Sequence, residues 1–193
     1  MGRSADVQRK TKETDVRCRI DLDGTGRVEV STGEGFLDKM MELQGWHGLL
    51  DLAVSARGDT QVDLHHTVED VGIVLGQAVQ KAIGERKGIR RFGFASTPMD
   101  EALVQVSLDC SGRGRAETGG RIPKGAPLSP SLVEGFLSAF AQNAGLTLHV
   151  DVRRGRDAHH VIEAVFKGLA GALREAVAPD PREGGVPSTK GAI

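Results

Sequence analysis

The chain has 193 residues and is 39% hydrophobic, so it can bury a core without disulfides or structural metals. Its 25 basic and 26 acidic residues leave a net charge of −1, which argues against nucleic-acid or membrane binding and favours a small-molecule partner. There is no signal-peptide pattern and no apolar run near the roughly 20 residues that span a bilayer. We therefore expect a cytoplasmic protein, in which Cys18 and Cys110 are thiols, although a single disulfide also fits the sequence.

The predicted elements come in the same order twice along the chain. A charged edge strand is expected at "RKTKETD", and a hairpin that turns at Asp23 and Gly24 is expected at "CRIDLDGTGRVEVST". "TPMDEAL" is typical of a capping segment with Asp100 and Glu101 at a helix start. Each half also has a helical pattern with "EGFL", followed by a strand-like run and a second helix. A strand is expected at "EALVQVSLDCSGRGRAE" between the halves, and a Pro- and Gly-rich tail ends the chain.

An internal repeat connects two histidine pairs. "DLHHTVEDVG" begins at Asp63, and "DAHHVIEAVF" begins 94 positions later at Asp157. The apolar residues that follow the two motifs also match, at i, i+4, i+7, i+8 and i+11, which is the stripe of an amphipathic helix. They are Val71, Leu75, Ala78, Val79 and Ala82 in the first copy and Val165, Leu169, Ala172, Leu173 and Ala176 in the second.

This pattern predicts an α/β (α+β) fold of two βαβ-type half-domains, with sheets packed on helices. No Pro-, Gly- or Ser-rich linker separates the halves, so we expect one domain over residues 1–193. Its pseudo-repeats cover about 10–95 and 96–180, and the tail covers 181–193.

The repeated motif H-H-x-x-E suggests a metal site. On a helix, His65 and His66 both lie on the face of Glu69, and adjacent imidazoles diverge by about 100°, so one pair suits two ions better than one. His159, His160 and Glu163 repeat the arrangement. Imidazole and carboxylate without thiolate favour Mn, Fe, Zn or Ni. A single such motif is more often a helix cap or a hydrogen-bonded core residue, but the duplication of four of the six histidines favours the metal site.

Basic and hydroxyl side chains near the second half suggest an anion cradle. "IRRFG", "GRGR" and "PSTKG" supply guanidinium, hydroxyl and ammonium donors at Arg91, Arg113, Ser188 and Lys190. Each of them alone fits a solvated surface equally well.

The motifs "RKTKET", "GFLD", "HHTVEDVG", "GIRRFG", "PMDEALV", "LDCSGR", "LTLHV", "HHVIEAVFK" and "PSTKG", in that order over nearly the whole chain, resemble those of imidazoleglycerol-phosphate dehydratases of histidine biosynthesis. The resemblance implies a duplicated fold of the ribosomal-protein-S5-domain-2-like type. It also implies two Mn²⁺ per active site, dehydration of imidazole glycerol phosphate to imidazole acetol phosphate, and a homo-oligomer of 24 subunits with sites at subunit interfaces.

The resemblance also implies roles for individual residues. The metal ligands are His65, His66, Glu69, His159, His160 and Glu163, and the phosphate clamp is Arg91, Arg113, Ser188 and Lys190. His47 and Lys167 contact the substrate. A metal-bound imidazolate would store the electron pair of the lost proton, while Glu13 and Glu163 would move protons at the ring carbon and at the departing hydroxyl.

The chain departs from the family pattern at three places. Lys39 stands where "GFLDHM" has a ligand histidine, Leu132 and Gly135 stand where we expect another histidine, and Leu43 replaces a substrate-facing glutamine. Two interpretations remain open: a dehydratase with altered metal binding, or a relative that keeps the assembly without catalysis. A purely structural duplicated domain would leave the paired histidines unexplained.

Overall fold

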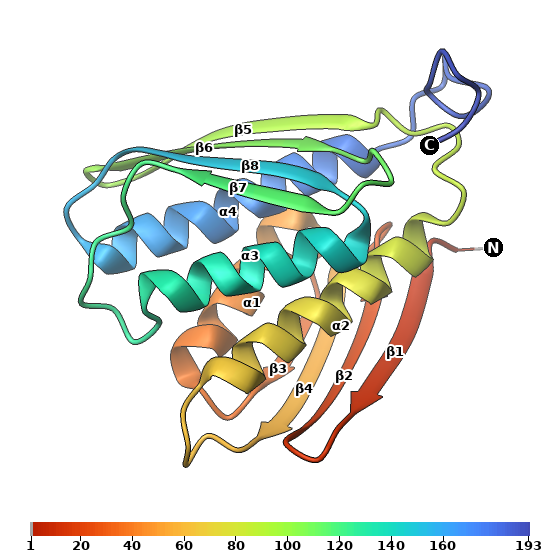
Figure 1. Cartoon of the computed structure of the whole chain (residues 1–193). Helices are drawn as coiled ribbons and strands as arrows, with labels where there is room; N and C mark the ends of the chain where they lie inside the picture. The colour runs from red at the N-terminus through yellow and green to blue at the C-terminus, as the bar shows by residue number, and fades with distance from the viewer. Residues whose placement is uncertain (1) are drawn as a thin grey trace.

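The two halves of the chain have the same sequence of elements. The computed structural model describes residues 2–193. Within them, each half runs strand, strand, strand, helix, strand, helix (Figure 1). The first half contains β1 (Ser4–Lys10), β2 (Thr14–Asp21), β3 (Val28–Ser31), α1 (Gly35–Gly48), β4 (Asp51–Gly58) and α2 (His65–Ile83). The second contains β5 (Phe92–Met99), β6 (Ala102–Asp109), β7 (Arg115–Gly119), α3 (Pro130–Ala144), β8 (Thr147–Arg154) and α4 (Ala158–Val177).

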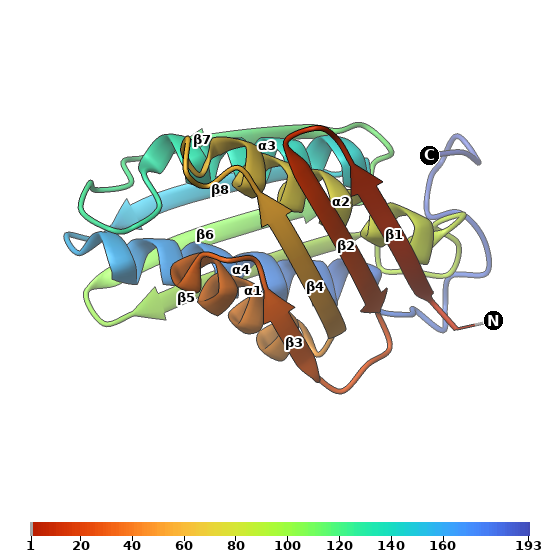
Figure 2. The same ribbon diagram turned by 90° about the horizontal axis from the view of Figure 1, so that it is seen from below.

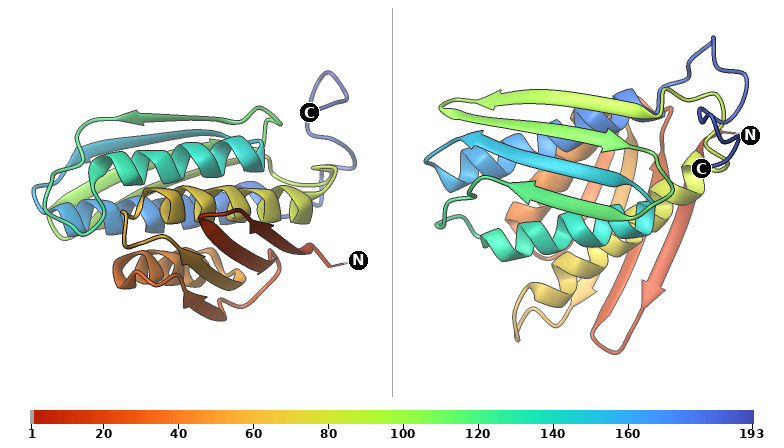
Figure 3. Two further views of the ribbon diagram at one scale, coloured as in Figure 1. Left: turned by 60° about the horizontal axis from the view of Figure 1, so that its bottom comes forward. Right: turned by 45° about the horizontal axis from the view of Figure 1, so that its top comes forward.

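Each half forms one mixed four-stranded sheet with the same pairing. In the first sheet β2 pairs antiparallel with β1 and β4, and β3 pairs in parallel with β4, which gives the order β1-β2-β4-β3 (Figure 2). The second sheet has the order β5-β6-β8-β7 with the same directions (Figure 3, right). The repeat seen in the sequence is therefore a repeat of topology.

The helices form a double layer between the two sheets (Figure 3, left). α1 and α2 lie on the first sheet, α3 and α4 lie on the second, and the layers meet where α2 packs on α3 and α1 packs on α4. The predicted architecture, two similar halves with sheets covering helices, is confirmed. No helix in residues 2–193 combines the length and the apolarity that a membrane crossing would need.

The predicted apolar stripes form the centre of this helix layer. Val71 and Leu75 of α2 and Val165 and Leu169 of α4 are each at most 1% exposed. Small residues let the layers approach closely: a Cβ atom at Gly76 of α2 would stand 2.6 Å from the carbonyl oxygen of Phe140 in α3. Both sheets therefore bury one face on the helices.

The predicted hairpin at Asp23 and Gly24 is wrong, because β4 lies between β2 and β3 in the sheet. The segment after β2 instead crosses to the far side of β4, where Asp51 Oδ1 accepts hydrogen bonds from the backbone N–H groups of Thr25 at 2.8 Å and Arg27 at 3.1 Å. The turn after β2 is at Leu22 and Asp23, and β3 is joined to its parallel partner β4 through α1.

The segment "TPMDEAL" is not a helix start. Met99 ends β5, Ala102 begins β6, and Asp100 and Glu101 form the tight turn between these two strands, with Asp100 at φ 47°. Alternating burial along β5 and β6 fits the strands better than a capped helix. The second "EGFL" lies inside α3, where the Ser129 hydroxyl caps the helix by accepting from the N–H of Leu132.

Both cysteines are buried in the core. Cys18 and Cys110 are free thiols that are 0% exposed, so the alternative of a disulfide is wrong. Burial raises the pKa of each thiol to about 12, which makes both poor nucleophiles.

Candidate active site

Each H-H-x-x-E motif begins a helix. His65, His66 and Glu69, here the first cluster, lie at the start of α2, and His159, His160 and Glu163, the second cluster, lie in the first turns of α4. An aspartate precedes each pair and accepts from its backbone: Asp63 from the N–H of His65 at 2.7 Å, and Asp157 from that of His159 at 2.7 Å. Both clusters are thus fixed at helix N-termini.

In each cluster the first histidine faces the glutamate one turn later. Nε2 of His65 lies 3.5 Å from Oε2 of Glu69, and Nε2 of His159 lies 3.2 Å from Oε2 of Glu163. Two ligands about 2.1 Å from one ion are separated by roughly 3.0–3.4 Å at common coordination angles. The His159–Glu163 pair therefore has the spacing of two ligands to a shared metal, and the His65–Glu69 pair is slightly wider.

The second histidine of each pair is held by a carboxylate from another element. Nδ1 of His66 lies 3.0 Å from Oδ2 of Asp59, and Nδ1 of His160 lies 2.7 Å from Oε2 of Glu101. These hydrogen bonds raise the pKa of both imidazoles. The other ring nitrogen of His160, Nε2, lies 3.5 Å from Oδ2 of Asp100. Support of Nδ1 by a carboxylate is the arrangement found behind metal-binding histidines.

Neighbouring histidines point in different directions. The ring centres of His65 and His66 are 5.8 Å apart at 81°, and those of His159 and His160 are 6.2 Å apart at 83°. The sequence-based expectation of one ion per imidazole is compatible with this divergence. Within residues 2–193, no three His, Cys, Asp or Glu side chains come together to hold an ion.

Further polar groups gather around Glu163. Its carboxylate lies 2.6 Å from Nζ of Lys167, and Phe36 of α1 packs edge-on against His159 with ring centres 5.1 Å apart. Partial burial opposes ionisation of Glu163, but the ammonium of Lys167 and the imidazole of His159 outweigh it and lower its pKa. Burial and the charge of Lys167 lower the pKa of His47, which keeps this imidazole neutral.

The other sequence-derived candidates of the first half lie on two different elements. Glu13 is exposed in the turn between β1 and β2, and its negative charge contributes to raising the pKa of His66. Lys39 is exposed on α1 one turn after Phe36, and its Nζ lies 3.2 Å from the Glu42 carboxylate. Leu43 on the same helix is partly buried against the core.

Arg91 is already bound within the chain. Its guanidinium donates to both carboxylate oxygens of Asp109, at 2.7 and 3.2 Å, and to the carbonyl oxygen of Pro187 at 2.8 Å. Its side chain is only 18% exposed. Arg91 therefore ties the C-terminal tail to the second sheet.

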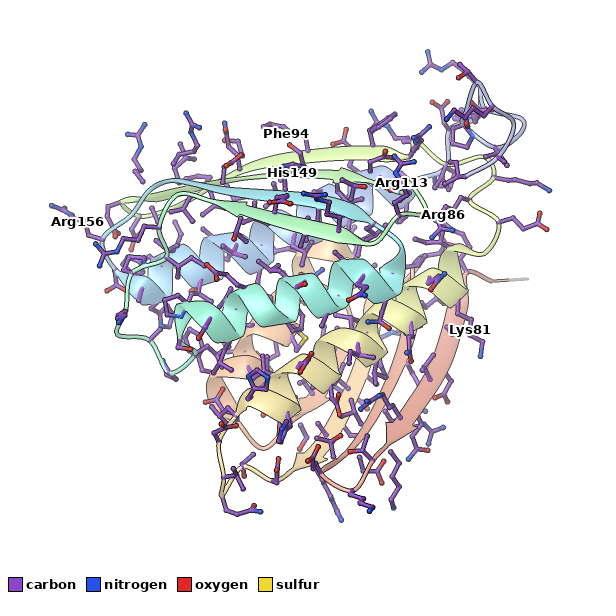
Figure 4. All side chains as sticks on the ribbon, in the orientation of Figure 1. Lys81, Arg86, Phe94, Arg113, His149 and Arg156 are labelled. Carbon is purple, nitrogen blue, oxygen red and sulfur yellow. The ribbon has the colours of Figure 1, made fainter. Side chains whose placement is uncertain are left out.

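The tail lies beside the loops that carry the other basic candidates. It passes Arg91 at Pro187, next to Ser188, and its last residue, Ile193, contacts Gly112, next to Arg113 (Figure 4). The structure thus brings Arg91, Arg113 and the tail with Ser188 and Lys190 to one end of the molecule. The second cluster is at the opposite end of α4, whose 20 residues span about 30 Å.

Two carboxylates that support the clusters were not identified as such from the sequence. Asp59 holds His66 and Glu101 holds His160. The 94-residue repeat does not relate them, because it matches Asp59 with Arg153 and Glu101 with Val7.

His149 lies on β8 with an exposed side chain on the outer face of the second sheet, where Ser107 of β6 stands between it and Phe94 of β5 (Figure 4). It is therefore a surface residue.

The two positions where a second-half histidine was expected lie on α3. Leu132 is partly buried against the core, and Gly135 has open space where a side chain would be.

Comparison with known proteins defines the class: the chain is a hydro-lyase, an enzyme that eliminates water from its substrate. More specifically, residues 32–173 match the family model for imidazoleglycerol-phosphate dehydratase, and the chain belongs to that family of histidine-biosynthesis enzymes.

Relatives and solved structures agree over the full length. The chain is 52% identical over 194 residues to the imidazoleglycerol-phosphate dehydratase of Methylorubrum extorquens, covering 99% of this chain and 100% of the relative. It is 53% identical over 195 residues to that of Moorella thermoacetica, covering 100% of both. The crystal structure of the Pyrococcus furiosus enzyme in complex with (S)-C348 is 36% identical with a TM-score of 0.85, covering 97% and 100%. The Staphylococcus aureus enzyme is also 36% identical, with a TM-score of 0.82, covering 92% and 99%.

Proposed function

We propose that this chain dehydrates imidazole glycerol phosphate to imidazole acetol phosphate with two Mn²⁺ ions held by the two clusters. The observation that carries the proposal is the duplicated geometry. In both halves a histidine and a glutamate are 3.2–3.5 Å apart, and a neighbouring histidine is supported at Nδ1 by a carboxylate. When bound, the ions would lower the pKa of the substrate ring, so that it can be held as an imidazolate after losing a proton.

Glu163 is suited to proton transfer. The adjacent ammonium of Lys167 keeps its carboxylate ionised, and its side chain is only 13% exposed, so it can accept a proton in a site from which most water is excluded. Glu13, on the exposed turn near His66, is our candidate for the second carboxylate. One of the two removes the carbon-bound proton, and the other protonates the departing hydroxyl.

His47 and Lys167 would hold the substrate. The neutral imidazole of His47 can both donate to and accept from a hydroxyl group, and the ammonium of Lys167 can stabilise negative charge that develops beside Glu163. We assign the phosphate to the end formed by Arg91, Arg113, Ser188 and Lys190, because the tail passes Arg91 and ends beside the loop of Arg113, so segments that carry guanidinium, hydroxyl and ammonium groups lie together there.

We also propose that complete sites form only between subunits of a homo-oligomer. The anion-binding end and the second cluster are separated by about the 30 Å length of α4, far more than a small phosphorylated substrate spans. Two imidazoles lie outside the clusters, those of His47 and His149. His149, exposed on the second sheet, could add a donor from a neighbouring subunit and replace the histidine expected near Leu132 and Gly135. In this assembly residues 1–193 act as one domain, with the tail belonging to the site.

Lys39 supports a second candidate function. A protonated lysine cannot bind a metal, and Lys39 lies one turn from the phenylalanine that contacts His159. A subunit with such a weakened site could keep the fold and bind a phosphorylated imidazole compound without turnover.

One experiment separates the two candidates. Purified protein is loaded with Mn²⁺, and the metal content per subunit is measured together with turnover of imidazole glycerol phosphate. About two ions per subunit with turnover, which chelation abolishes and Mn²⁺ restores, supports the enzyme. Glu163→Gln should remove turnover, whereas Glu117→Gln, an exposed control paired with Arg115, should not. Metal uptake without turnover would support the second candidate, and undiminished turnover without metal would contradict the proposed mechanism.

A further inference from the structure

The turn that carries Glu13 is closed by its own hydrogen bonds. The hydroxyl of Thr11 accepts from the backbone N–H groups of Glu13 at 3.1 Å and Thr14 at 2.9 Å, and the N–H of Thr11 donates to the carbonyl oxygen of Thr14 at 2.8 Å. These bonds fix the shape of the turn. They do not fix its position relative to α2, where the first cluster lies.

Asp70 supplies that connection. It follows Glu69 on α2, is 8% exposed, and lies one turn after His66. Its Oδ2 atom accepts from the hydroxyl of Thr14, at the first residue of β2, and from Nη1 of Arg9 on β1 at 2.5 Å. A single buried carboxylate thus binds both strands of the hairpin directly behind the turn.

The second half does without this aspartate. The repeat of 94 positions relates His66 to His160 and Glu69 to Glu163, but it relates Asp70 to Ala164, which is 0% exposed. There the equivalent hairpin turn carries Glu101, whose carboxylate is fixed directly by the N–H groups of Arg156 at 2.9 Å and Asp157 at 2.8 Å. The carboxylate of Glu101 is therefore itself hydrogen-bonded, whereas the turn of Glu13 is held by Asp70 through Arg9 and Thr14.

We propose that Asp70 is a positioning residue for Glu13. By anchoring Arg9 and Thr14 to α2, it holds the turn so that the Glu13 carboxylate faces the first cluster without being bound itself. The inference rests on the proposed role of Glu13 in proton transfer. A buried carboxylate carries a desolvation cost that its hydrogen bonds must offset. The two bonds from Asp70 to the hairpin therefore hold Arg9 and Thr14 in position.

A double-mutant cycle in the assembled, Mn²⁺-loaded enzyme tests the proposal. We expect Asp70→Asn to lower kcat by about 10- to 100-fold, with KM and the Mn²⁺ titration midpoint unchanged, because only the placement of a proton-transfer group is lost. In a Glu13→Gln background, Asp70→Asn should lower kcat by less than about a further twofold. Asp15→Asn on the same hairpin, where Asp15 pairs with Gln8 and Lys10 at the surface, is the matched control and should leave kcat unchanged.

Hydrogen exchange gives a readout independent of turnover. In Asp70→Asn the amides of Glu13 and Thr14 should exchange faster, while those of α2 beyond its first turn stay protected. If Asp70→Asn fails to fold, Thr14→Val removes one of the two anchoring bonds and takes its place.

The outcomes are distinguishable. If Asp70→Asn lowers kcat as much in the Glu13→Gln background as in the wild type, or if it shifts the Mn²⁺ midpoint, the positioning role of Asp70 is overturned. The proposed role of Glu13 is then unaffected. Wild-type kcat in Glu13→Gln would instead overturn the proposed role of Glu13 and the inference with it. Unchanged exchange at Glu13 and Thr14 would overturn the anchoring.

Discussion

Oε2 of Glu101 lies 2.7 Å from Nδ1 of His160, although the two residues are 59 positions apart and belong to a hairpin turn and a helix. The same carboxylate accepts from two backbone N–H groups, so it links the turn, the loop after β8 and the start of α4. The hydrogen bonds from Asp157, from Arg156 and from His160 together lower the pKa of Glu101 to about 2.

This contact predicts an acid-sensitive step in the stability of the metal-free protein. Because the folded-state pKa of Glu101 is depressed, its stabilising contribution is present above the ordinary value of 4.5 and is lost as the pH falls toward about 2. Thermal unfolding followed by circular dichroism should show a smaller decrease in Tm over this range for Glu101→Gln than for the wild type. Parallel decreases for both proteins would show that Glu101 contributes nothing to acid sensitivity.

Lys39→His should tighten Mn²⁺ binding. The change replaces an ammonium, which cannot ligate, with an imidazole donor on the helix whose first turn contacts His159. We expect a decrease in the apparent Kd of at least about tenfold in a calorimetric titration of the assembled protein. Lys39→Gln, which removes the charge without adding an imidazole, is the control, and equal Kd values for the two variants would place Lys39 away from the ions.

Lys190→Ala should weaken substrate capture more than metal binding. Lys190 lies on the tail at the anion-binding end, about the length of α4 from the second cluster. We expect KM for imidazole glycerol phosphate to rise by about tenfold, the order of one charge-assisted hydrogen bond, with the Mn²⁺ midpoint unchanged. Lys124→Ala, on the loop before α3, provides the comparison; a loss of Mn²⁺ binding equal to the loss of substrate binding in Lys190→Ala would contradict a phosphate role.

Gly76→Ala should destabilise the contact between the two helix layers. A Cβ atom there would lie 2.6 Å from the Phe140 carbonyl oxygen and 2.9 Å from the Asn143 Cβ, so α2 and α3 would have to move apart. We expect a loss of about 1–3 kcal/mol in the free energy of unfolding, measured by denaturant titration. Gly135→Ala on α3, where an added Cβ atom meets nothing within 4 Å, should instead be neutral or stabilising by up to about 1 kcal/mol. Equal effects of the two substitutions would mean that α2 and α3 tolerate separation.

The helices could be predicted from the sequence because their signal is local. The stripe through Val71 and Leu75 repeats at helical spacing, and its 94-residue copy identified the duplication. The strand pairing could not be predicted in the same way, since nothing near Asp23 shows that β4 will enter the sheet between β2 and β3. Pairing between segments separated by a helix is decided by the folded chain as a whole.

The site was predictable only in part, for a related reason. His65 with Glu69 and His159 with Glu163 are one helical turn apart, so their proximity follows from spacing. Asp59 and Glu101 reach their histidines across turns, and Asp70 reaches Arg9 across 61 positions, so these contacts exist only in the assembled fold. Glu101 was noticed in the sequence but interpreted as a helix cap, because a carboxylate at a turn and one at a helix start look alike in one dimension.

The matching strand orders of the two sheets have a consequence for how each half is covered. A polypeptide with only one half would expose its helix pair to water on the side that the other half now covers. The duplicated chain supplies this cover itself, and its halves carry different residues at equivalent positions, such as Asp70 on α2 and Ala164 on α4.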